Sequence, residues 1–138
     1  MTCEDWIMVV ENSDAHAHIC ARALSQVGLE HPVHVETDAE SALRRLFAAA
    51  AEDRLPFLIL LSLSLPALDG LDALRLLADE GIIPRTTVVV TSRIADRTLP
   101  ERCARLGAAA YLVEAPTDDE WIRQLRTLPA VAQRITPP

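Results

Sequence analysis

Residues 58–70 read LILLSLSLPALDG, and this stretch decides the fold. The apolar run from Phe57 to Leu61 is typical of a central strand in a parallel sheet, because such a strand is covered on both faces. The serines and Pro66 that follow interrupt the run and indicate a loop at the carboxyl end of the strand. Functional sites of parallel α/β sheets lie at these ends, so Ser62, at the end of the strand, is the first candidate site residue.

Strand and helix patterns alternate along the rest of the chain. Short apolar runs predict four further strands, at residues 6–10, 33–35, 87–90 and 109–113. Helical patterns cover residues 15–27, about 38–51, 71–80, 98–106 and 118–128, and Thr-x-x-Glu capping boxes begin at Thr37, Thr98 and Thr117. Parallel strands need right-handed helical crossovers, so we predict an α/β fold: a doubly wound, five-stranded parallel sheet with five helices in a three-layer sandwich.

The size and charge of the chain limit the classes of function. Its 138 residues fit one domain, and half of them are hydrophobic, which is enough for a core. We expect one domain over residues 1–138, with a core at 5–128, a frayed tail at 129–138 and no output domain. The net charge of −7 disfavours binding to nucleic acid or to an anionic membrane.

The cysteines and the N-terminus predict a soluble, cytoplasmic protein. Cys3, Cys20 and Cys103 are odd in number and include no CxxC motif, which argues against a disulfide framework or a structural zinc site. The N-terminus lacks a signal peptide, and the longest apolar stretch, residues 57–68, is too short to span a membrane.

The histidines predict no metal site. His16 and His18 are two residues apart on a predicted helix and therefore point to different faces. His16 shares a face with Cys20, but that pair lacks further ligands. The histidines all lie in the first quarter of the chain, and nothing in the sequence places one beside Ser62 as a catalytic base, so we expect a non-enzymatic protein.

Over about residues 5–128, the chain resembles the receiver domain of response regulators, the CheY-like family. The resemblance rests on the positions of Glu11 and Asn12, Ser62, Pro66, Asp69, Gly70, Thr91 and Tyr111. It implies that Glu11 and Asn12 occupy the positions of the acidic pair that holds Mg²⁺. It also implies that Ser62 occupies the phosphoacceptor position, and that Thr91 and Tyr111 are the switch residues.

The chain departs from the family pattern at its charged positions. The family's phosphate-accepting aspartate is replaced by Ser62, and one acid of the metal-binding pair is replaced by Asn12. Glu114 stands at the position of the family's lysine, and the chain contains no lysine at all. The proline that follows is one residue late, at Pro116, so whether the Ala115–Pro116 bond is cis stays open.

These losses predict a degenerate receiver without a cofactor. Aspartyl phosphorylation needs an ionised carboxylate as nucleophile, with Mg²⁺ and a cation to balance the phosphoryl oxygens. Ser62 needs a base to act as a nucleophile, and Glu114 would repel the phosphoryl group. We therefore expect Mg²⁺ binding to be weak or absent.

The leading interpretation is a stand-alone, atypical receiver, or pseudo-receiver, in two-component phosphorelay signalling. It would act by phosphorylation-independent contact with a histidine kinase or another signalling protein. The resemblance implies that partners, or a second copy in a homodimer, bind the face built from the fourth helix, the fifth strand and the fifth helix. The candidate contact residues on that face are Arg97, Arg102, Arg105, Tyr111, Trp121 and Arg123.

Two alternatives stay open at the level of sequence. A histidine kinase could phosphorylate the chain at a non-standard residue, Ser62 or a nearby acid such as Asp69. The vacated pocket around Asn12, Ser62 and Thr91 could instead bind a small ligand. An unrelated enzyme on the same fold is disfavoured, since no nucleophile and base are visible as a pair.

Overall fold

The computed structural model describes residues 4–93, 97–114 and 117–135, and its centre is one parallel sheet. The five strands are β1 (Glu4–Val10), β2 (Val33–Glu36), β3 (Pro56–Ser62), β4 (Thr87–Ser92) and β5 (Ala110–Val113). They lie in the order β2-β1-β3-β4-β5, and every neighbouring pair is parallel. The order reverses between β1 and β3, which is where sheets of this kind carry their sites. The predicted sheet is confirmed.

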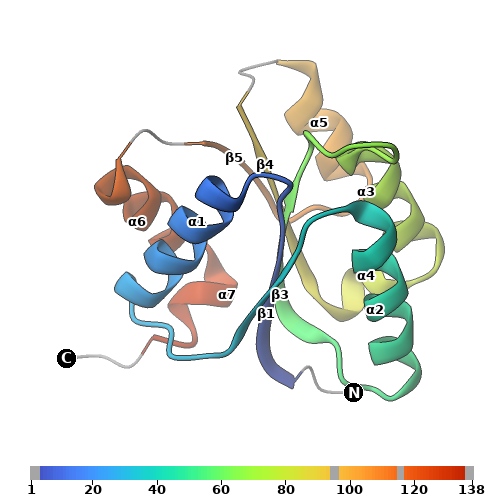
Figure 1. The fold of residues 1–138 in the computed structure, drawn as a ribbon, viewed down its shortest axis with the longest axis horizontal. Coiled ribbons are helices and arrows are strands. Elements are labelled where there is room, and N and C mark those ends of the chain that lie inside the picture. The colour runs from blue at the N-terminus through green and yellow to red at the C-terminus, as the bar shows by residue number, and fades with distance from the viewer. Residues whose placement is uncertain (1–3, 94–96, 115–116, 136–138) are drawn as a thin grey trace.

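Helices cover both faces of the sheet, as the prediction of three layers requires (Figure 1). On one side lie α1 (Asp14–Gln26), α6 (Asp118–Arg126) and α7 (Pro129–Ala132). On the other lie α2 (Ala39–Ala51), α3 (Gly70–Asp79), α4 (Ile82–Arg85) and α5 (Thr98–Arg105). The α/β sandwich is therefore confirmed, although the described residues form seven helices rather than the predicted five. The two additional helices, α4 and α7, have four residues each, which is too short for a periodic apolar pattern to reveal them.

The sheet separates two apolar cores because successive side chains of a strand point to opposite faces. Ile7 and Val9 of β1 lie in the core under α1 and α6, whereas Met8 and Val10 lie in the core under α2 and α3. All seven residues of β3 are buried. This burial explains why its sequence is a continuous apolar run rather than an alternating one.

The predicted frayed tail is wrong for residues 129–135. Val131 of α7 is fully buried, and Ile135 packs against the core under α1 and α6. Pro129 stands in the first turn of α7, where its missing N–H costs no hydrogen bond. The end of the described chain therefore closes one layer of the sandwich.

One of the three predicted capping boxes caps its helix as expected. The Thr117 hydroxyl accepts a hydrogen bond of 3.3 Å from the Glu120 N–H at the start of α6. At α2 the cap is the next residue, Asp38, whose carboxylate accepts a 2.8 Å hydrogen bond from the Ser41 N–H. At α5, Thr98 lies inside the helix and is not its N-cap.

Gly70 begins α3 directly beneath the loop that follows β3. A Cβ atom at this position would lie 2.1 Å from the Ser62 carbonyl oxygen and 2.6 Å from the Leu63 Cα, so only glycine fits. The Gly70 N–H donates to the Leu63 carbonyl at 3.3 Å. This close approach holds the end of β3 and the start of α3 together.

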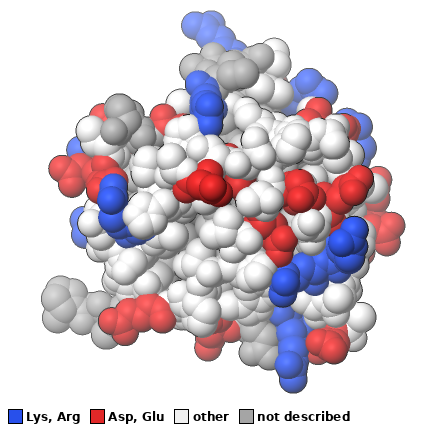
Figure 2. All heavy atoms as spheres, viewed as in Figure 1, with Lys and Arg blue, Asp and Glu red and all other residues white. Residues whose placement is uncertain are grey.

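Among the helices described, none combines the length and the apolar character that crossing a membrane requires. On the face shown in Figure 2, acidic and basic side chains are scattered among uncharged ones.

Candidate functional site

The predicted site residues meet at the carboxyl edge of the sheet. Ser62 is the last residue of β3 and pairs in register with Thr91 of β4. Glu11 directly follows β1, and Glu114 directly follows β5. Because parallel strands end at the same edge, residues more than 100 positions apart in the sequence become neighbours there.

Ser62 is 1% exposed, and its hydrogen bonding is local. Its hydroxyl oxygen accepts a 3.1 Å hydrogen bond from the Ser64 N–H, two residues further along the chain. This contact is a serine turn, which satisfies the buried hydroxyl and starts the loop after β3.

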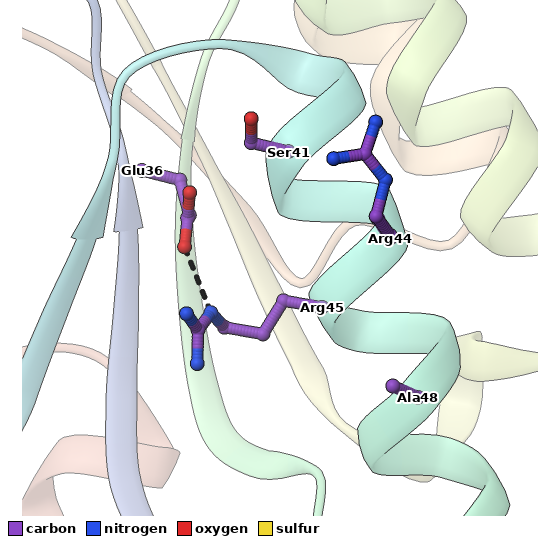
Figure 3. A pocket seen from close by; sticks show the side chains of 5 residues that line it. All are labelled: Glu36, Ser41, Arg44, Arg45 and Ala48. Carbon is purple, nitrogen blue, oxygen red and sulfur yellow. Dashed lines mark hydrogen bonds and ion pairs between the residues drawn. The ribbon is translucent and has the colours of Figure 1, made fainter.

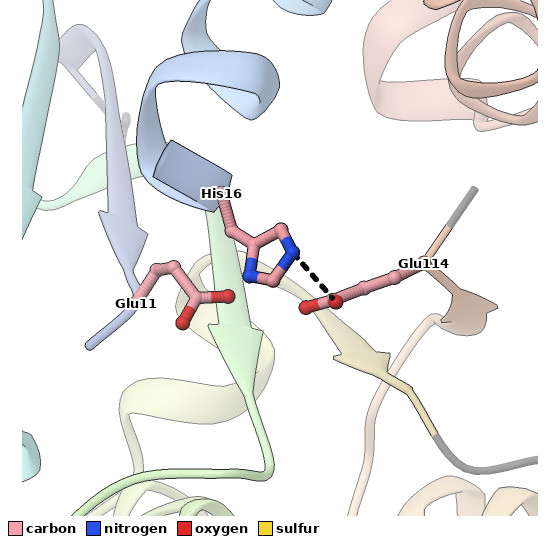
Figure 4. A group of neighbouring side chains, drawn as sticks. All are labelled: Glu11, His16 and Glu114. Carbon is pink, nitrogen blue, oxygen red and sulfur yellow. Dashed lines mark ion pairs between the residues drawn. The ribbon is translucent and has the colours of Figure 1, made fainter. Parts of the chain in front are cut away.

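Glu11, His16 and Glu114 form a cluster at this edge (Figure 4). One ligand-capable atom from each residue lies within 4.8 Å of the other two. The His16 Nε2 atom is 3.7 Å from the Glu114 Oε2 atom. His16 enters from the first turn of α1, and the two glutamates enter from the ends of β1 and β5.

Burial acts on the protonation of Glu11, the buried member of this cluster. Glu11 is 3% exposed, and this burial raises the pKa of its carboxyl group. The Ser13 N–H, which donates to Oε2 at 3.1 Å, lowers the pKa, whereas the neighbouring Glu114 carboxyl raises it. The proximity of Glu114 therefore adds to burial in disfavouring the negative charge of Glu11.

Arg93 is the cation that the structure places beside this cluster. It follows β4 directly, and its Nε donates to the Glu114 Oε2 at 3.0 Å. Its guanidinium group also contacts the His16 Nδ1. The Arg93 side chain is about half exposed, while that of Glu114 is only 10% exposed. The negative charge of Glu114 is thus balanced by an arginine from a neighbouring strand.

The remaining predicted pocket and switch residues differ in their exposure. Asn12 is exposed, whereas Thr91 is 3% exposed within β4. Tyr111 of β5 is half-buried and packs against the core on the side of α2 and α3. Residues 115 and 116 lie outside the described residues, and so does the Ala115–Pro116 bond.

The predicted interface residues do not all lie on the surface. Arg97, Arg102, Arg105 and Arg123 are exposed. Trp121 is 3% exposed and belongs to the core under α1 and α6, which corrects its assignment as a contact residue. The helical period of α6 turns Trp121 and Leu125, four residues apart, inward together and leaves Arg123 outside.

Sequence reasoning missed His16 and Arg93 as site residues. Each lies on an element next to the strand edge, His16 in the first turn after β1 and Arg93 one residue after β4. These positions in the sequence could have indicated both residues, because the loops and first helical turns that follow strands face the carboxyl edge of the sheet. The spacing of ligands along the helix of His16 does not reveal Glu11 and Glu114, which follow β1 and β5.

A hollow lies between α2 and the end of β2 (Figure 3). It is lined by Glu36, Ser41, Arg44, Arg45 and Ala48. Arg45 reaches across it, and its Nε donates to the Glu36 Oε2 at 2.8 Å. His34 Nε2 is 2.5 Å from the same oxygen, so the Glu36 carboxylate serves as a partner for both side chains.

Comparisons with known proteins give the family. A family model described as the response regulator receiver domain matches residues 7–126. The chain is 26% identical over 132 residues to the response regulator GacA of Pseudomonas protegens, covering 95% of this chain and 58% of that protein. It is also 26% identical over 95 residues to the transcriptional regulatory protein MctR of Rhizobium johnstonii, covering 69% of this chain and 44% of that protein. The chain thus spans about half the length of the curated relatives it matches.

Solved structures agree on the fold. A response regulator receiver domain from Rhodospirillum rubrum superposes with a TM-score of 0.80 at 26% identity, and the match covers 96% of both chains. The phosphorylated cyanobacterial phytochrome response regulator RcpA superposes with a TM-score of 0.76 at 24% identity, over 88% of both chains. Receiver domains act in two-component signalling, where they interact with histidine kinases and other signalling proteins, and they are generally signalling domains rather than enzymes. With residues 7–126 matched and the sheet order of that fold, this chain belongs to the response regulator receiver domain family.

Proposed function

We propose that this chain is an atypical receiver that acts by protein–protein contact, without phosphorylation of an aspartate. The observation that carries the proposal is Ser62, which stands where the family resemblance implies the phosphoacceptor. A buried hydroxyl that already accepts the Ser64 N–H offers neither the negative charge nor the free lone pairs of an aspartate carboxylate.

The surroundings of Ser62 support the same proposal. The Arg93–Glu114 ion pair lies at the end of β5, where the resemblance implies a lysine that would neutralise a phosphoryl group. In this pair the arginine's charge is already balanced by Glu114, and Glu114 itself would repel an incoming phosphoryl group.

The residues present do not fit the family's Mg²⁺ site. Mg²⁺ demands near-octahedral oxygen ligands and usually one or two carboxylates. Of the three positions that the resemblance implies, only Glu11 carries a carboxyl group, and burial raises the pKa of that group. We therefore include weak or absent Mg²⁺ binding in the proposal and route no step through that ion.

The surface proposed for partners is built from α5, β5 and α6. It carries four exposed arginines, Arg97, Arg102, Arg105 and Arg123, together with the half-buried Tyr111. The side chain of Arg105 is engaged with Glu101 at 2.9 Å, within the same helix. Arginine and tyrosine are common anchors of protein interfaces, which supports this face as the contact site for a histidine kinase, another signalling protein or a second copy.

A cytoplasmic location belongs to the same proposal. Cys20 and Cys103 are free thiols in the described part of the chain, as a reducing compartment favours. The net charge of −7 supports protein partners over nucleic acid or an anionic membrane.

Intact-mass analysis after incubation with Mg²⁺ and a small phosphodonor tests the proposal. The native chain should show no phosphoryl adduct, because Ser62 lacks an ionised nucleophile. A Ser62→Asp variant tests whether the remaining pocket still works, and Ser64→Asp is the matched control with the same carboxylate two residues away. A phosphoryl adduct on the native chain would overturn the proposal, and peptide mapping would then locate the modified residue.

The proposed face is tested separately by the oligomeric state. If a homodimer uses it, Tyr111→Ala and Arg102→Glu should shift sedimentation velocity profiles toward the monomer. Arg44→Glu, on α2, reverses a charge outside this face and is the matched control. Dimerisation that is unchanged in the first two variants would exclude this face as the dimer contact.

A further inference from the structure

The cluster of Glu11, His16 and Glu114 offers a set of metal ligands that differs from the acidic Mg²⁺ site that the family resemblance implies. It takes an imidazole from α1 and a carboxylate from the end of β5, and it shares only Glu11 with the acidic pair after β1. We propose that these three side chains bind a first-row divalent transition-metal ion such as Zn²⁺. This proposal does not depend on whether the chain is phosphorylated.

The geometry requires only small side-chain movements to close around an ion. The three ligand atoms lie within 4.8 Å of one another, and the His16 Nε2 is 3.7 Å from the Glu114 Oε2. Ligand atoms at zinc bond lengths in a tetrahedral site are about 3.4 Å apart. The main chain at Glu11 is held by a 2.9 Å hydrogen bond from its N–H to the Glu36 carbonyl, and at Glu114 by a 2.8 Å bond to the Ser92 carbonyl. The two backbone positions are therefore fixed before an ion arrives.

The donor set selects the class of ion. Imidazole suits zinc, copper, iron and nickel, whereas Mg²⁺ and Ca²⁺ prefer oxygen ligands alone. Two carboxylates and one imidazole would leave at least one coordination position open to water, as in zinc sites with three protein ligands. A divalent ion bound by Glu11 and Glu114 would also place a positive charge between their carboxyl groups.

Arg93 competes with the ion for two of the three proposed ligands. Its guanidinium group contacts both the Glu114 carboxylate and the His16 Nδ1. Because arginine only donates hydrogen bonds, this contact makes Nδ1 an acceptor and leaves the ring proton on Nε2, which faces Glu114. An ion bound at Nε2 must therefore displace this ring proton, and an ion bound at the Glu114 carboxylate competes with Arg93, whose side chain is about half exposed. Removal of Arg93 should therefore strengthen ion binding, an effect that is not expected if the ion binds at acidic side chains elsewhere on the surface.

Isothermal titration with Zn²⁺ tests the site, using the full chain in a Cys3→Ser background to remove a competing thiol, at about pH 7.5, where histidine is largely neutral. Binding should saturate at one ion per chain. His16→Gln and Glu114→Gln should each weaken it at least about tenfold, since even the loss of outer partners of a metal site costs about 10–100-fold. Arg93→Gln should tighten binding. Millimolar Mg²⁺ should not displace the ion.

His18→Gln is the matched control, because it removes an exposed histidine from the same helix. It should leave the affinity unchanged. The proposal is overturned if the parent chain shows no saturable binding, or if both His16→Gln and Glu114→Gln bind as tightly as the parent. A loss with His18→Gln equal to that with His16→Gln would also overturn it, since binding would then not depend on the cluster. Circular dichroism melting shows whether each variant is folded. If one of the two ligand variants does not fold, the other still tests the site.

Discussion

At the scale of single residues, polar side chains at the carboxyl edge of the sheet find their partners locally. Ser62 is satisfied by the Ser64 N–H, and Glu11 by the Ser13 N–H. Glu114 is balanced by Arg93. Burying a polar group without a partner is costly, which explains why these three side chains are all engaged.

Cys20 makes a prediction about stability and pH. Burial, with a smaller contribution from Glu11 and Glu114, raises the pKa of the Cys20 thiol to about 12. A thiol in the unfolded chain ionises near pH 8.5. The stabilisation tied to this group is therefore fully present below about pH 8.5 and is lost as the pH rises toward about 12.

Urea unfolding of the native chain and of Cys20→Ala, at about pH 7.5 and pH 10, measures this effect on either side of the ordinary thiol pKa. Both proteins share every other titrating group, so the free energy of unfolding should fall less between the two pH values in the variant. An equal fall in both proteins would contradict the assignment to Cys20.

At the scale of elements, similar sequence patterns have different outcomes at different helices. The three Thr-x-x-Glu patterns are equivalent as sequence, yet only Thr117 caps its helix. Asp38 caps α2 because its carboxylate is one residue closer to the free N–H groups at the start of that helix. Which residue takes the N-cap conformation depends on how the preceding strand or loop delivers the chain.

Thr117→Ala should lower the free energy of unfolding by about 1 kcal/mol, because the N-cap hydrogen bond to the Glu120 N–H is lost. Thr37→Ala is the matched control: it makes the same change in the same sequence pattern, at an exposed residue outside the cap. The control should change the stability by less than about 0.5 kcal/mol. Thermal or urea unfolding measures both, and equal effects would contradict the role of Thr117 as a cap.

At the scale of the whole molecule, the two cores decide which side chains remain available to partners. Trp121 on α6 packs with Leu125 of the same helix and Val131 of α7 in the core under α1. The sheet and its helices enclose this ring completely enough that it contributes to stability and not to a surface contact. The proposed partner face consequently depends on arginines and Tyr111.

Trp121→Ala should lower the free energy of unfolding by about 3–5 kcal/mol, as expected for truncating a buried aromatic side chain. Arg123→Ala, two residues away on the exposed side of the same helix, should change the stability by less than about 0.5 kcal/mol. Chemical denaturation measures both variants. A Trp121→Ala protein as stable as the native chain would mean that the ring does not pack in this core.

The fold could be predicted from the sequence because its signals are local. An unbroken apolar run at residues 57–61 indicates a central strand, and the helical patterns between the strands indicate parallel crossovers. The short helices α4 and α7 lack such signals, since one turn shows no period. The burial of Trp121 was not predicted because the resemblance implies that its helix is a contact surface, although Trp121 and Leu125 lie four residues apart on one face of α6.

The sequence by itself determined the parallel α/β architecture, the family resemblance and the uncharged residue at position 62. Only the tertiary structure decided that His16 meets Glu11 and Glu114, and that Arg93 balances Glu114. The physical reason is that apolar periodicity reports how each segment is buried against the sheet. Contacts at the carboxyl edge join four separate segments, and their geometry depends on strand register and side-chain direction, which no local pattern records.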